Sequence, residues 1–320
     1  MSGVKGHMPV SRQRILLFLK GMAMGAADSV PGVSGGTVAL MTNIYEELID
    51  AIRAIDLQVL VILKNAGIKP AWTHIHGNFL LTLFAGIATS LLLLGRLILT
   101  LMDNSLPYLL AFFAGLVLAS IRYVASGISQ WSIQRGLLLA AGTLLALALA
   151  FLPLREESGG LVYFFFSGAI AICAMILPGI SGAFILVLLG AYGPVLEALT
   201  GFDVPVVLVF AAGCACGLMG FSRVLSWLLH HRHEATLAML TGMLAGSLYL
   251  LWPWRVATEL DLASHAFTSY RHVMPGTYEA ITGQGFSPLI CLGLLTAGAG
   301  LVLLLESLAG QNTGETSATS

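Results

Sequence analysis

The sequence predicts an all-α polytopic membrane protein with two inverted repeats, each made of a re-entrant helix hairpin and three transmembrane helices. The first observation behind this prediction is the composition: 57% of the 320 residues are hydrophobic, only 10% are charged, and the mean hydropathy is +0.90. A soluble domain has about a quarter charged residues, and a disordered chain has low hydrophobicity, so both classes are excluded. The formal charge of −1 offers no basic surface for nucleic acid.

The second observation is an apolar segment that is interrupted at its centre. Residues 1–14 are expected to form a cytoplasmic tail, and the interrupted segment follows at 15–52. Residues 30–36 read VPGVSGG. Because proline removes an N–H and clashes with the preceding helical turn, one helix should end here and another begin. The segment is therefore predicted to form two half-helices in a re-entrant hairpin.

Three uninterrupted apolar stretches complete the first repeat, which covers 15–153. About 20 apolar residues in a helix cross the hydrocarbon core of a bilayer. The stretches 79–101, 106–126 and 136–153 fit this length. A polar connection around 53–78 separates them from the hairpin.

The second repeat, 161–306, has the same organisation. Its hairpin is expected at 161–199, where residues 177–182 read LPGISG. Its three spans are expected at 205–229, 235–254 and 286–306, before a polar C-terminal tail at 307–320.

The third observation is the alignment of the two halves. The hairpins match at an offset of 147 residues through Gly21 and Gly168, Ala27 and Ala174, Pro31 and Pro178, Gly32 and Gly179, Ser34 and Ser181, Gly35 and Gly182, and Tyr45 and Tyr192. The later spans match at an offset of 127 through Gly86 and Gly213, Arg96 and Arg223, Gly115 and Gly242, and Ser120 and Ser247. The change in offset falls in the polar connection, where an insertion is tolerated best.

The topology follows from the number of spans and the basic residues. Three full spans per repeat invert the second copy, and both termini are then cytoplasmic. The inner side carries Lys5, Arg12, Arg14, Lys20, Arg53, Lys64, Lys69, Arg122, Arg135 and Arg232, and the outer side carries Arg155, Arg255 and Arg271. If the hairpins crossed the membrane completely, the basic loop at 53–78 would lie outside. The positive-inside rule therefore favours re-entrant hairpins.

The interruptions are the predicted substrate site. Irregular backbone inside a membrane survives only where protein buries it or it lines a wet cavity, so the two turns should meet near the midplane. Free amides at the positive ends of half-helices bind anions. The expected phosphate-binding residues are Gly32, Ser34, Gly35, Gly36 and Thr37 with Gly179, Ser181 and Gly182. The alternative is that these glycines only allow close helix packing.

Three charged residues in the apolar segments have two interpretations each. Arg96 and Arg223 are candidate phosphate ligands because a guanidinium binds phosphate through two parallel hydrogen bonds; alternatively, they extend to the membrane interface. Asp28 is a candidate coupling site for H⁺ or Na⁺, or it caps the following half-helix.

The remaining polar residues indicate no metal site and no cofactor. Cys173, Cys214, Cys216 and Cys291 lie in apolar runs without metal-ligand spacing and are expected to pack as small side chains. Glu46, Glu47, Asp50 and Glu197 are expected to be solvated. Tyr45 and Tyr192 are interfacial anchors or donors to the cavity. The run His230-His231-Arg232-His233 either senses pH on the inner face or is an ordinary basic loop.

Residues 25–37, which read GAADSVPGVSGGT, together with YEEL at 45–48 and LPGISG at 177–182, resemble a family of bacterial and archaeal polyprenyl-phosphate transporters. This family was formerly a domain of unknown function, and the resemblance covers about 15–306. It implies that undecaprenyl phosphate returns from the outer to the inner leaflet of the cytoplasmic membrane, a role similar to that of DedA-type proteins. Ala183-Phe184 replaces Gly36-Thr37 in the second motif, which predicts unequal phosphate contacts from the two halves.

The leading hypothesis is thus a non-enzymatic lipid-phosphate translocase that recycles the lipid carrier of envelope glycan synthesis. A cation-coupled transporter or channel for a small soluble anion would use the same architecture. A third hypothesis is a membrane enzyme such as a lipid phosphatase, which needs a nucleophile beside a base or an acidic metal cluster. No histidine falls in a predicted span, which disfavours the enzyme.

Overall fold

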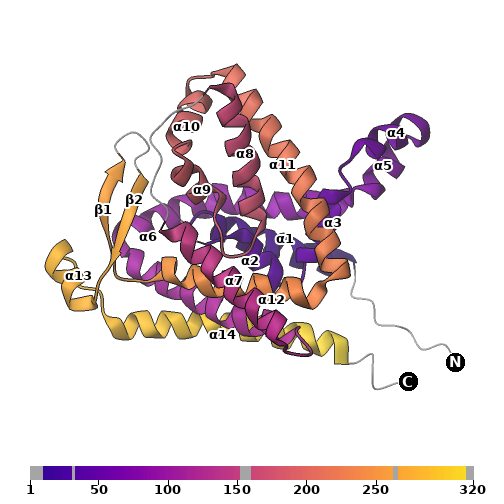
Figure 1. Ribbon diagram of the computed structural model, residues 1–320. Helices are drawn as coiled ribbons and strands as arrows, with labels where there is room; N and C mark the ends of the chain where they lie inside the picture. The colour runs from indigo at the N-terminus through magenta and orange to yellow at the C-terminus, as the bar shows by residue number, and fades with distance from the viewer. Residues whose placement is uncertain (1–9, 31–32, 152–159, 262–265, 315–320) are drawn as a thin grey trace.

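The computed structural model describes residues 10–30, 33–151, 160–261 and 266–314, and it is mostly helical (Figure 1). The helices of the first half are α1 (Val10–Asp28), α2 (Gly35–Met41), α3 (Tyr45–Arg53), α4 (Leu57–Ala66), α5 (Ile68–His74), α6 (Gly77–Ser126) and α7 (Ile133–Ala150). The helices of the second half are α8 (Leu161–Ile176), α9 (Gly182–Leu189), α10 (Tyr192–Thr200), α11 (Val204–His231), α12 (His233–Ser247), α13 (Pro275–Thr282) and α14 (Pro288–Gly314), with a short 3₁₀ helix at Leu248–Leu251.

Five helical segments are long and apolar enough to cross a bilayer: Gly77–Gly95, Asn104–Ser126, Ile133–Ala150, Val204–His231 and His233–Leu251. They fall on five of the apolar stretches expected from the sequence. The sixth stretch corresponds to α14, whose apolar part is Pro288–Leu304. The chain is therefore a multi-pass α-helical membrane protein.

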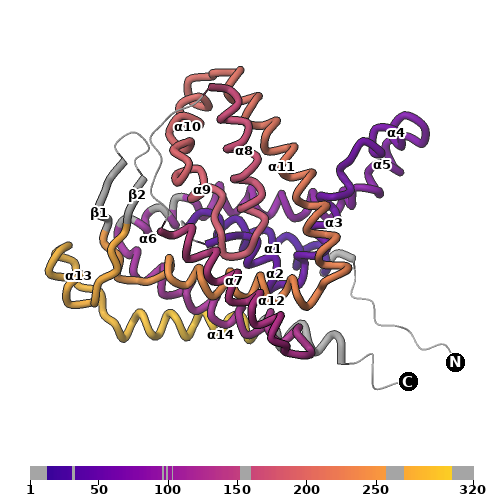
Figure 2. Tube along the Cα trace, viewed as in Figure 1, coloured from indigo at the N-terminus to yellow at the C-terminus, as the bar shows by residue number. Residues whose placement is uncertain are grey.

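The helices break at the two positions where the sequence contains Pro-Gly. Helix α1 ends at Asp28 and α2 begins at Gly35, while Pro31 and Gly32 lie outside the described residues. Helix α8 ends at Ile176 and α9 begins at Gly182. The two breaks lie at the centre of the molecule (Figures 1 and 2), where α2 packs against α8.

The first two long helices of each half are joined by equivalent glycine contacts. A Cβ atom added at Gly21 on α1 would lie 2.3 Å from the carbonyl oxygen of Leu83 on α6. At the equivalent place, a Cβ on Gly168 of α8 would lie 2.5 Å from the carbonyl oxygen of Phe210 on α11. Only glycine allows such close backbone approach. The same correspondence holds for Gly86 against Phe18, at 2.2 Å, and Gly213 against Phe165, at 2.0 Å.

Glycines also join the two halves, and these contacts are reciprocal. Helix α14 of the second half packs on the second part of α6, where a Cβ at Gly115 would lie 1.9 Å from the oxygen of Leu295. Helix α7 of the first half packs on α12, where a Cβ at Gly242 would lie 2.0 Å from the oxygen of Leu139. The last span of each half thus packs on the middle span of the other.

The chain also leaves helical geometry at equivalent positions between the first and second spans of each half. Ser105 within α6 has φ −148° and ψ 31°, two residues before Pro107. Arg232, which is 127 positions later, separates α11 from α12 with φ −135° and ψ 41°. The two halves therefore share a local backbone conformation as well as a sequence.

Two connections contain secondary structure that the sequence did not predict. The structure agrees with the expected α-helical polytopic membrane fold and adds one feature after α12, where β1 (Arg255–Asp261) and β2 (Ala266–His272) form an antiparallel hairpin. The connection around 53–78 contains α4 and α5, which project from the body on the side opposite this β-hairpin (Figure 1). The α4–α5 pair exposes Leu57 and Ile68 to 80% and 76%.

Candidate functional site

The two helix breaks contact each other through side chains of the first hairpin. The hydroxyl oxygen of Thr37 accepts a hydrogen bond from the backbone N–H of Gly179 at 3.0 Å. The hydroxyl of Ser34 lies 3.3 Å from the carbonyl oxygens of both Met175 and Leu177. Ser34 and Thr37 are 1% and 3% exposed, so these polar contacts are buried. The sequence prediction that the breaks lie together agrees with this geometry.

Tyr45 adds a third link between the hairpins. It is the first residue of α3 and is 2% exposed. Its phenolic O–H donates to the carbonyl oxygen of Ile176 at 3.2 Å. Ile176 is the last residue of α8, where carbonyl groups lack helical partners. The first hairpin therefore supplies hydroxyl donors to the negative end of α8, and Tyr45 uses its hydroxyl in a buried bond to the protein backbone, which is neither of the two roles expected from the sequence.

The carboxylate of Asp28 occupies the N-terminus of α2. Its Oδ1 accepts a hydrogen bond from the N–H of Gly35 at 2.6 Å, and the next amide, that of Gly36, is bound by the hydroxyl of Ser34 at 3.1 Å. No lysine, arginine or histidine forms an ion pair with Asp28 in the described part of the chain. The first amide of α2 thus binds an anionic group of the protein itself, and the second binds a neutral hydroxyl.

The glycines at the breaks are required by close approach. A Cβ at Gly35 would lie 2.4 Å from Oδ2 of Asp28, and a Cβ at Gly36 would lie 2.6 Å from the carbonyl oxygen of Ile176. Gly179 has φ +83°, and a Cβ there would lie 3.0 Å from the carbonyl oxygen of Met243 on α12. A Cβ at Gly182 would lie 2.8 Å from the carbonyl oxygen of Ala171. Packing alone therefore explains part of the glycine pattern.

The second break is less enclosed than the first. Ser181 begins α9 without a side-chain capping bond and is half-buried, and Ala183 is exposed. The structure places Ser181 and Gly182 beside the end of α8, so they lie close to the contacts of Ser34 and Thr37. Unequal polar contributions from the two halves are visible here.

Of the two arginines, only the side chain of Arg223 is described, and it makes no hydrogen bond to the residues of the breaks. Arg223 is exposed on α11 and donates to the carbonyl of Met219, one turn earlier on the same helix. Neither of the two roles expected for Arg223 is decided by this contact. Arg96 belongs to α6, and its side chain lies outside the described part of the structure, as does Gly32.

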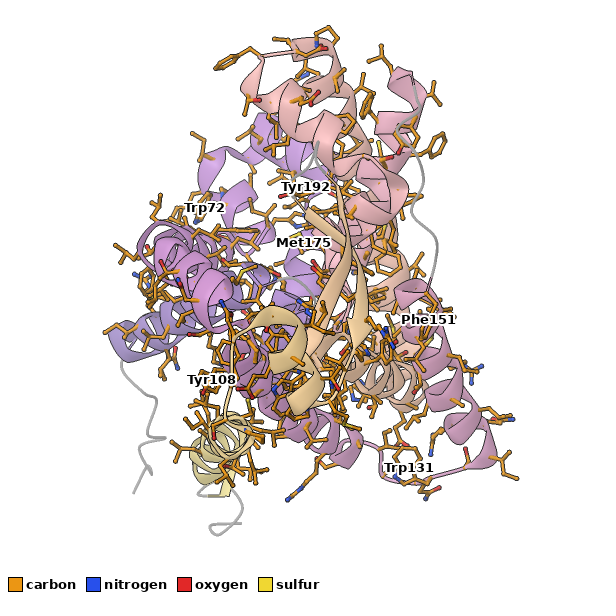
Figure 3. All side chains as sticks on the ribbon, turned by 90° about the vertical axis from the view of Figure 1, so that its left-hand side faces the viewer. Trp72, Tyr108, Trp131, Phe151, Met175 and Tyr192 are labelled. Atoms are coloured by element: carbon orange, nitrogen blue, oxygen red, sulfur yellow. The ribbon has the colours of Figure 1, made fainter. Side chains whose placement is uncertain are left out.

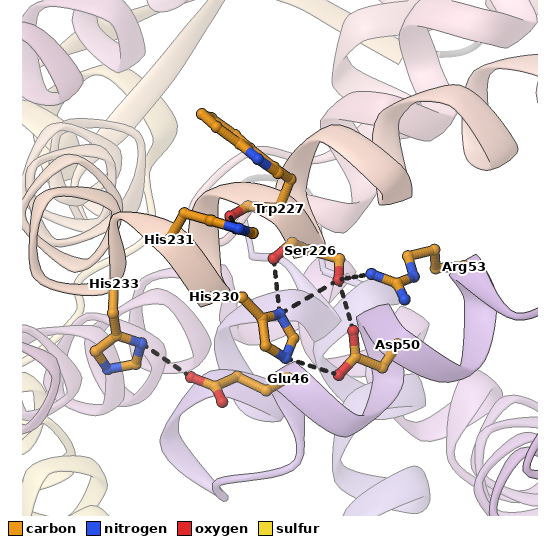
Figure 4. A network of polar contacts seen from close by, with 8 residues as sticks. All are labelled: Glu46, Asp50, Arg53, Ser226, Trp227, His230, His231 and His233. Atoms are coloured by element: carbon orange, nitrogen blue, oxygen red, sulfur yellow. Dashed lines mark hydrogen bonds and ion pairs between the residues drawn. The ribbon is translucent and has the colours of Figure 1, made fainter.

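A polar network that the sequence did not predict joins α3 to α11 (Figure 4). The hydroxyl of Ser226 donates to Oδ1 of Asp50 at 2.6 Å and accepts from Arg53 at 3.1 Å. His230 lies 3.6 Å from the other carboxylate oxygen of Asp50, and His233 lies 3.2 Å from Glu46. Asp50 and Glu46 thus contact residues of the other half, His230 on α11 and His233 on α12, while both carboxylates remain accessible to solvent, as the sequence predicts. The sequence signal was their position on the polar face of an amphipathic half-helix.

Among the described residues, no group of three or more His, Cys, Asp or Glu side chains could hold a metal ion. Cys173, Cys214, Cys216 and Cys291 are free thiols. The chemistry available at the breaks is therefore hydrogen bonding from amides and hydroxyls, together with one carboxylate. The amides of Gly35, Gly36 and Gly179 are each bonded within the protein in this structure, so an anionic oxygen ligand would have to replace their present acceptors.

Comparison with known proteins decides the family. A profile described as undecaprenyl phosphate translocase-like matches residues 24–268, which include both breaks and the α3–α11 network. The chain belongs to this family. It is 42% identical over 295 residues to a polyprenyl-phosphate transporter of Vibrio cholerae, covering 91% of this chain and 96% of that protein. It is 28% identical over 261 residues to a polyprenyl-phosphate transporter of Staphylococcus aureus, covering 73% of this chain and 85% of that protein. No solved structure matches the chain.

Proposed function

We propose that the protein translocates polyprenyl phosphate, with undecaprenyl phosphate as the substrate class, across the bacterial cytoplasmic membrane. Family membership and the names of its two relatives support this substrate. The observation that carries the mechanism is the buried contact of Ser34 and Thr37 with the end of α8, because it brings two helix ends and their hydrogen-bonding groups together between membrane-spanning helices. The isoprenoid chain stays in the lipid.

The phosphate binds where the breaks meet. The proposed ligands are the amides and hydroxyls of Gly32, Ser34, Gly35, Gly36, Thr37, Gly179, Ser181 and Gly182, with Arg96 and Arg223 as cations along the path of the head group. Because Asp28 already holds the amide of Gly35, phosphate and carboxylate compete for one donor. A proton or Na⁺ on Asp28 removes that competition, which couples phosphate binding to the ion.

The two halves are proposed to be inverted repeats that expose the site alternately to each leaflet. The matched glycine contacts within each half and the reciprocal contacts between halves support a two-fold relation. Three full spans per half and the distribution of basic loop residues support inversion, with both termini cytoplasmic. The direction of recycling is from the outer to the inner leaflet, without chemical change of the lipid.

The test uses purified protein in vesicles that contain labelled undecaprenyl phosphate in one leaflet. A change in leaflet accessibility that depends on the protein, without release of inorganic phosphate, is the expected result. Phosphate release would instead indicate an enzyme, and flux of a soluble anion without the lipid would indicate the anion transporter. Asp28→Asn should abolish the response to a proton or Na⁺ gradient while downhill equilibration continues. Asp203→Asn, which alters an exposed helix cap, is the control.

A further inference from the structure

A pocket of about 420 Å³ lies where the first half of α1, the start of α3 and the first turns of α6 meet. Its polar lining consists of Gln13, Arg14, Lys20, Glu47, Asn78 and Thr82. We propose that this α1–α6 pocket is a second binding site, which takes the phosphate head group of a lipid and is separate from the helix breaks. Its part in transport rests on the proposed function, whereas the binding itself does not.

The charges of the pocket favour an anion. Arg14 and Lys20 lie on α1, and Glu47 is the one acidic side chain in the described lining. The ammonium group of Lys20 donates to the carbonyl oxygen of Thr42 at 2.7 Å, which fixes its position. Its other two protons face the pocket, where the carboxylate of Glu47 also attracts them. The guanidinium of Arg14 is exposed and can bind a phosphate through two parallel hydrogen bonds.

The start of α6 adds further donors. Its N-terminal residue follows His76, which has a left-handed conformation (φ 51°) and makes no side-chain cap. The Oδ1 atom of Asn78 accepts from the indole N–H of Trp72 at 3.0 Å, so its NH₂ group is directed away from that bond and can donate to a ligand. The positive end of the α6 dipole lies beside these groups.

The second half provides an internal comparison. The positions equivalent to the six polar lining residues are Gly160, Leu161, Ser167, Pro194, Pro205 and Val209. None of them is charged, although α8 packs on α11 through the same glycine contacts that join α1 to α6. The fold therefore does not need charges at this place. Arg14 and Lys20 already count among the inner-side basic residues, so it is their grouping with Asn78 and Thr82 around one pocket that points to an anion site.

Apolar surface next to the pocket suits the rest of a lipid. Ile15, Leu16 and Leu19 on α1 are 60%, 41% and 51% exposed, and Leu16 itself lines the pocket. The volume lies in the range of small-molecule sites, which is about 300–1,000 Å³. A phosphate at Arg14 and Lys20 would therefore place its chain along the exposed face of α1. A free anion would gain nothing from that face.

The test measures binding of three probes to the purified full-length protein in detergent: undecaprenyl phosphate, phosphatidylglycerol and inorganic phosphate. The variant is Arg14→Gln with Lys20→Met. Its matched control is Lys64→Gln with Lys69→Gln, which removes the same charge from the exposed α4–α5 pair. We expect at least tenfold weaker binding of one or both phosphate lipids to the variant and unchanged binding to the control. The lipid that loses affinity identifies the natural source.

Loss of the Lys20 bond to Thr42 could impair folding of the double variant, so the single variant Arg14→Gln is measured as well. We expect this single variant to bind the lipid about threefold more weakly than the natural protein. Undecaprenol, which lacks the phosphate, should bind all variants equally. Equal lipid binding by variant and control would overturn the proposal, and so would binding of inorganic phosphate as tight as that of the lipids. Ser181→Ala at the breaks should retain pocket binding while slowing transport, which separates a failure of this site from a failure of the proposed function.

Discussion

The two helix breaks have the same sequence pattern but different surroundings. In the first half, Ser34 and Thr37 are buried, and Tyr45 is 2% exposed and bonded to α8. In the second half, Tyr192 is half-buried and Ala183 is exposed. Figure 3 labels Tyr192, and also Met175, which replaces Asp28, in the part formed by α8, α9 and α10. The difference shows that the first break is more deeply buried than the second, although each contacts the other.

The helices next to the breaks show the same asymmetry. Helix α3 packs against α11 of the other half, where the network of Asp50, Ser226 and His230 lies. In the described part of the chain, α10 packs on α9 and α11 of its own half. In the alternating mechanism proposed above, we infer that this asymmetry marks the state closed at α3 and open at α10. Four experiments test the comparison.

The largest effect is expected at Gly36, because the equivalent position of the second half is Ala183 rather than a glycine. Gly36→Ala should destabilise the protein by about 1–3 kcal/mol, because the new Cβ would lie 2.6 Å from the carbonyl oxygen of Ile176. Transport in vesicles should fall at least tenfold. Ala183→Gly, the reverse change at the equivalent position, should alter melting temperature and transport only slightly. Equal losses from both changes would show that the breaks are packed alike.

Thr37→Val should have the next largest effect. It removes the acceptor of the Gly179 amide and leaves a buried N–H unpaired, at a cost of about 1–3 kcal/mol measured by thermal unfolding. Thr200→Val is the matched control, since that hydroxyl bonds within its own helix and is exposed. An unchanged melting temperature for Thr37→Val would mean that the contact between the hairpins contributes nothing to stability.

Tyr45→Phe sharpens the comparison with Tyr192. The lost hydrogen bond to Ile176 should cost about 1 kcal/mol, and transport should change modestly because the ring still packs. Tyr192→Phe should lie within experimental error of the natural protein. A larger loss for Tyr192→Phe would reverse the assignment of the closed and open sides.

The smallest effect is expected at the α3–α11 network. A double-mutant cycle of Asp50→Asn and Ser226→Ala should give a coupling free energy of about 0.5–1 kcal/mol, because the carboxylate is partly solvated. Glu197→Gln, the equivalent change in α10, should not alter stability. Additive effects of the two substitutions would indicate that the α3–α11 contact is not held by this pair.

The sequence predicted the parts of the fold that depend on the chemistry of single residues and on the length of apolar stretches. Proline at 31 and 178 located both breaks, and apolar stretches of bilayer length located the spans. The repeat also predicted that the breaks lie together. The α3–α11 network was missed because Asp50 and His230 are 180 positions apart and a charge near a helix end is usually solvated. The β-hairpin was missed because Arg255 is buried under Tyr270 by tertiary contacts that no local pattern reveals.

The paired backbone irregularities at Ser105 and Arg232 have a mechanical consequence. Glycine contacts pack α1 against the first part of α6, and they pack α8 against α11. The second part of α6 packs against α14 instead, and α12 packs against α7. We expect a rearrangement of one such pair against its neighbours to bend the chain at Ser105 and Arg232, where helical geometry is already interrupted. A disulfide clamp across either position should then slow transport without touching the ligand.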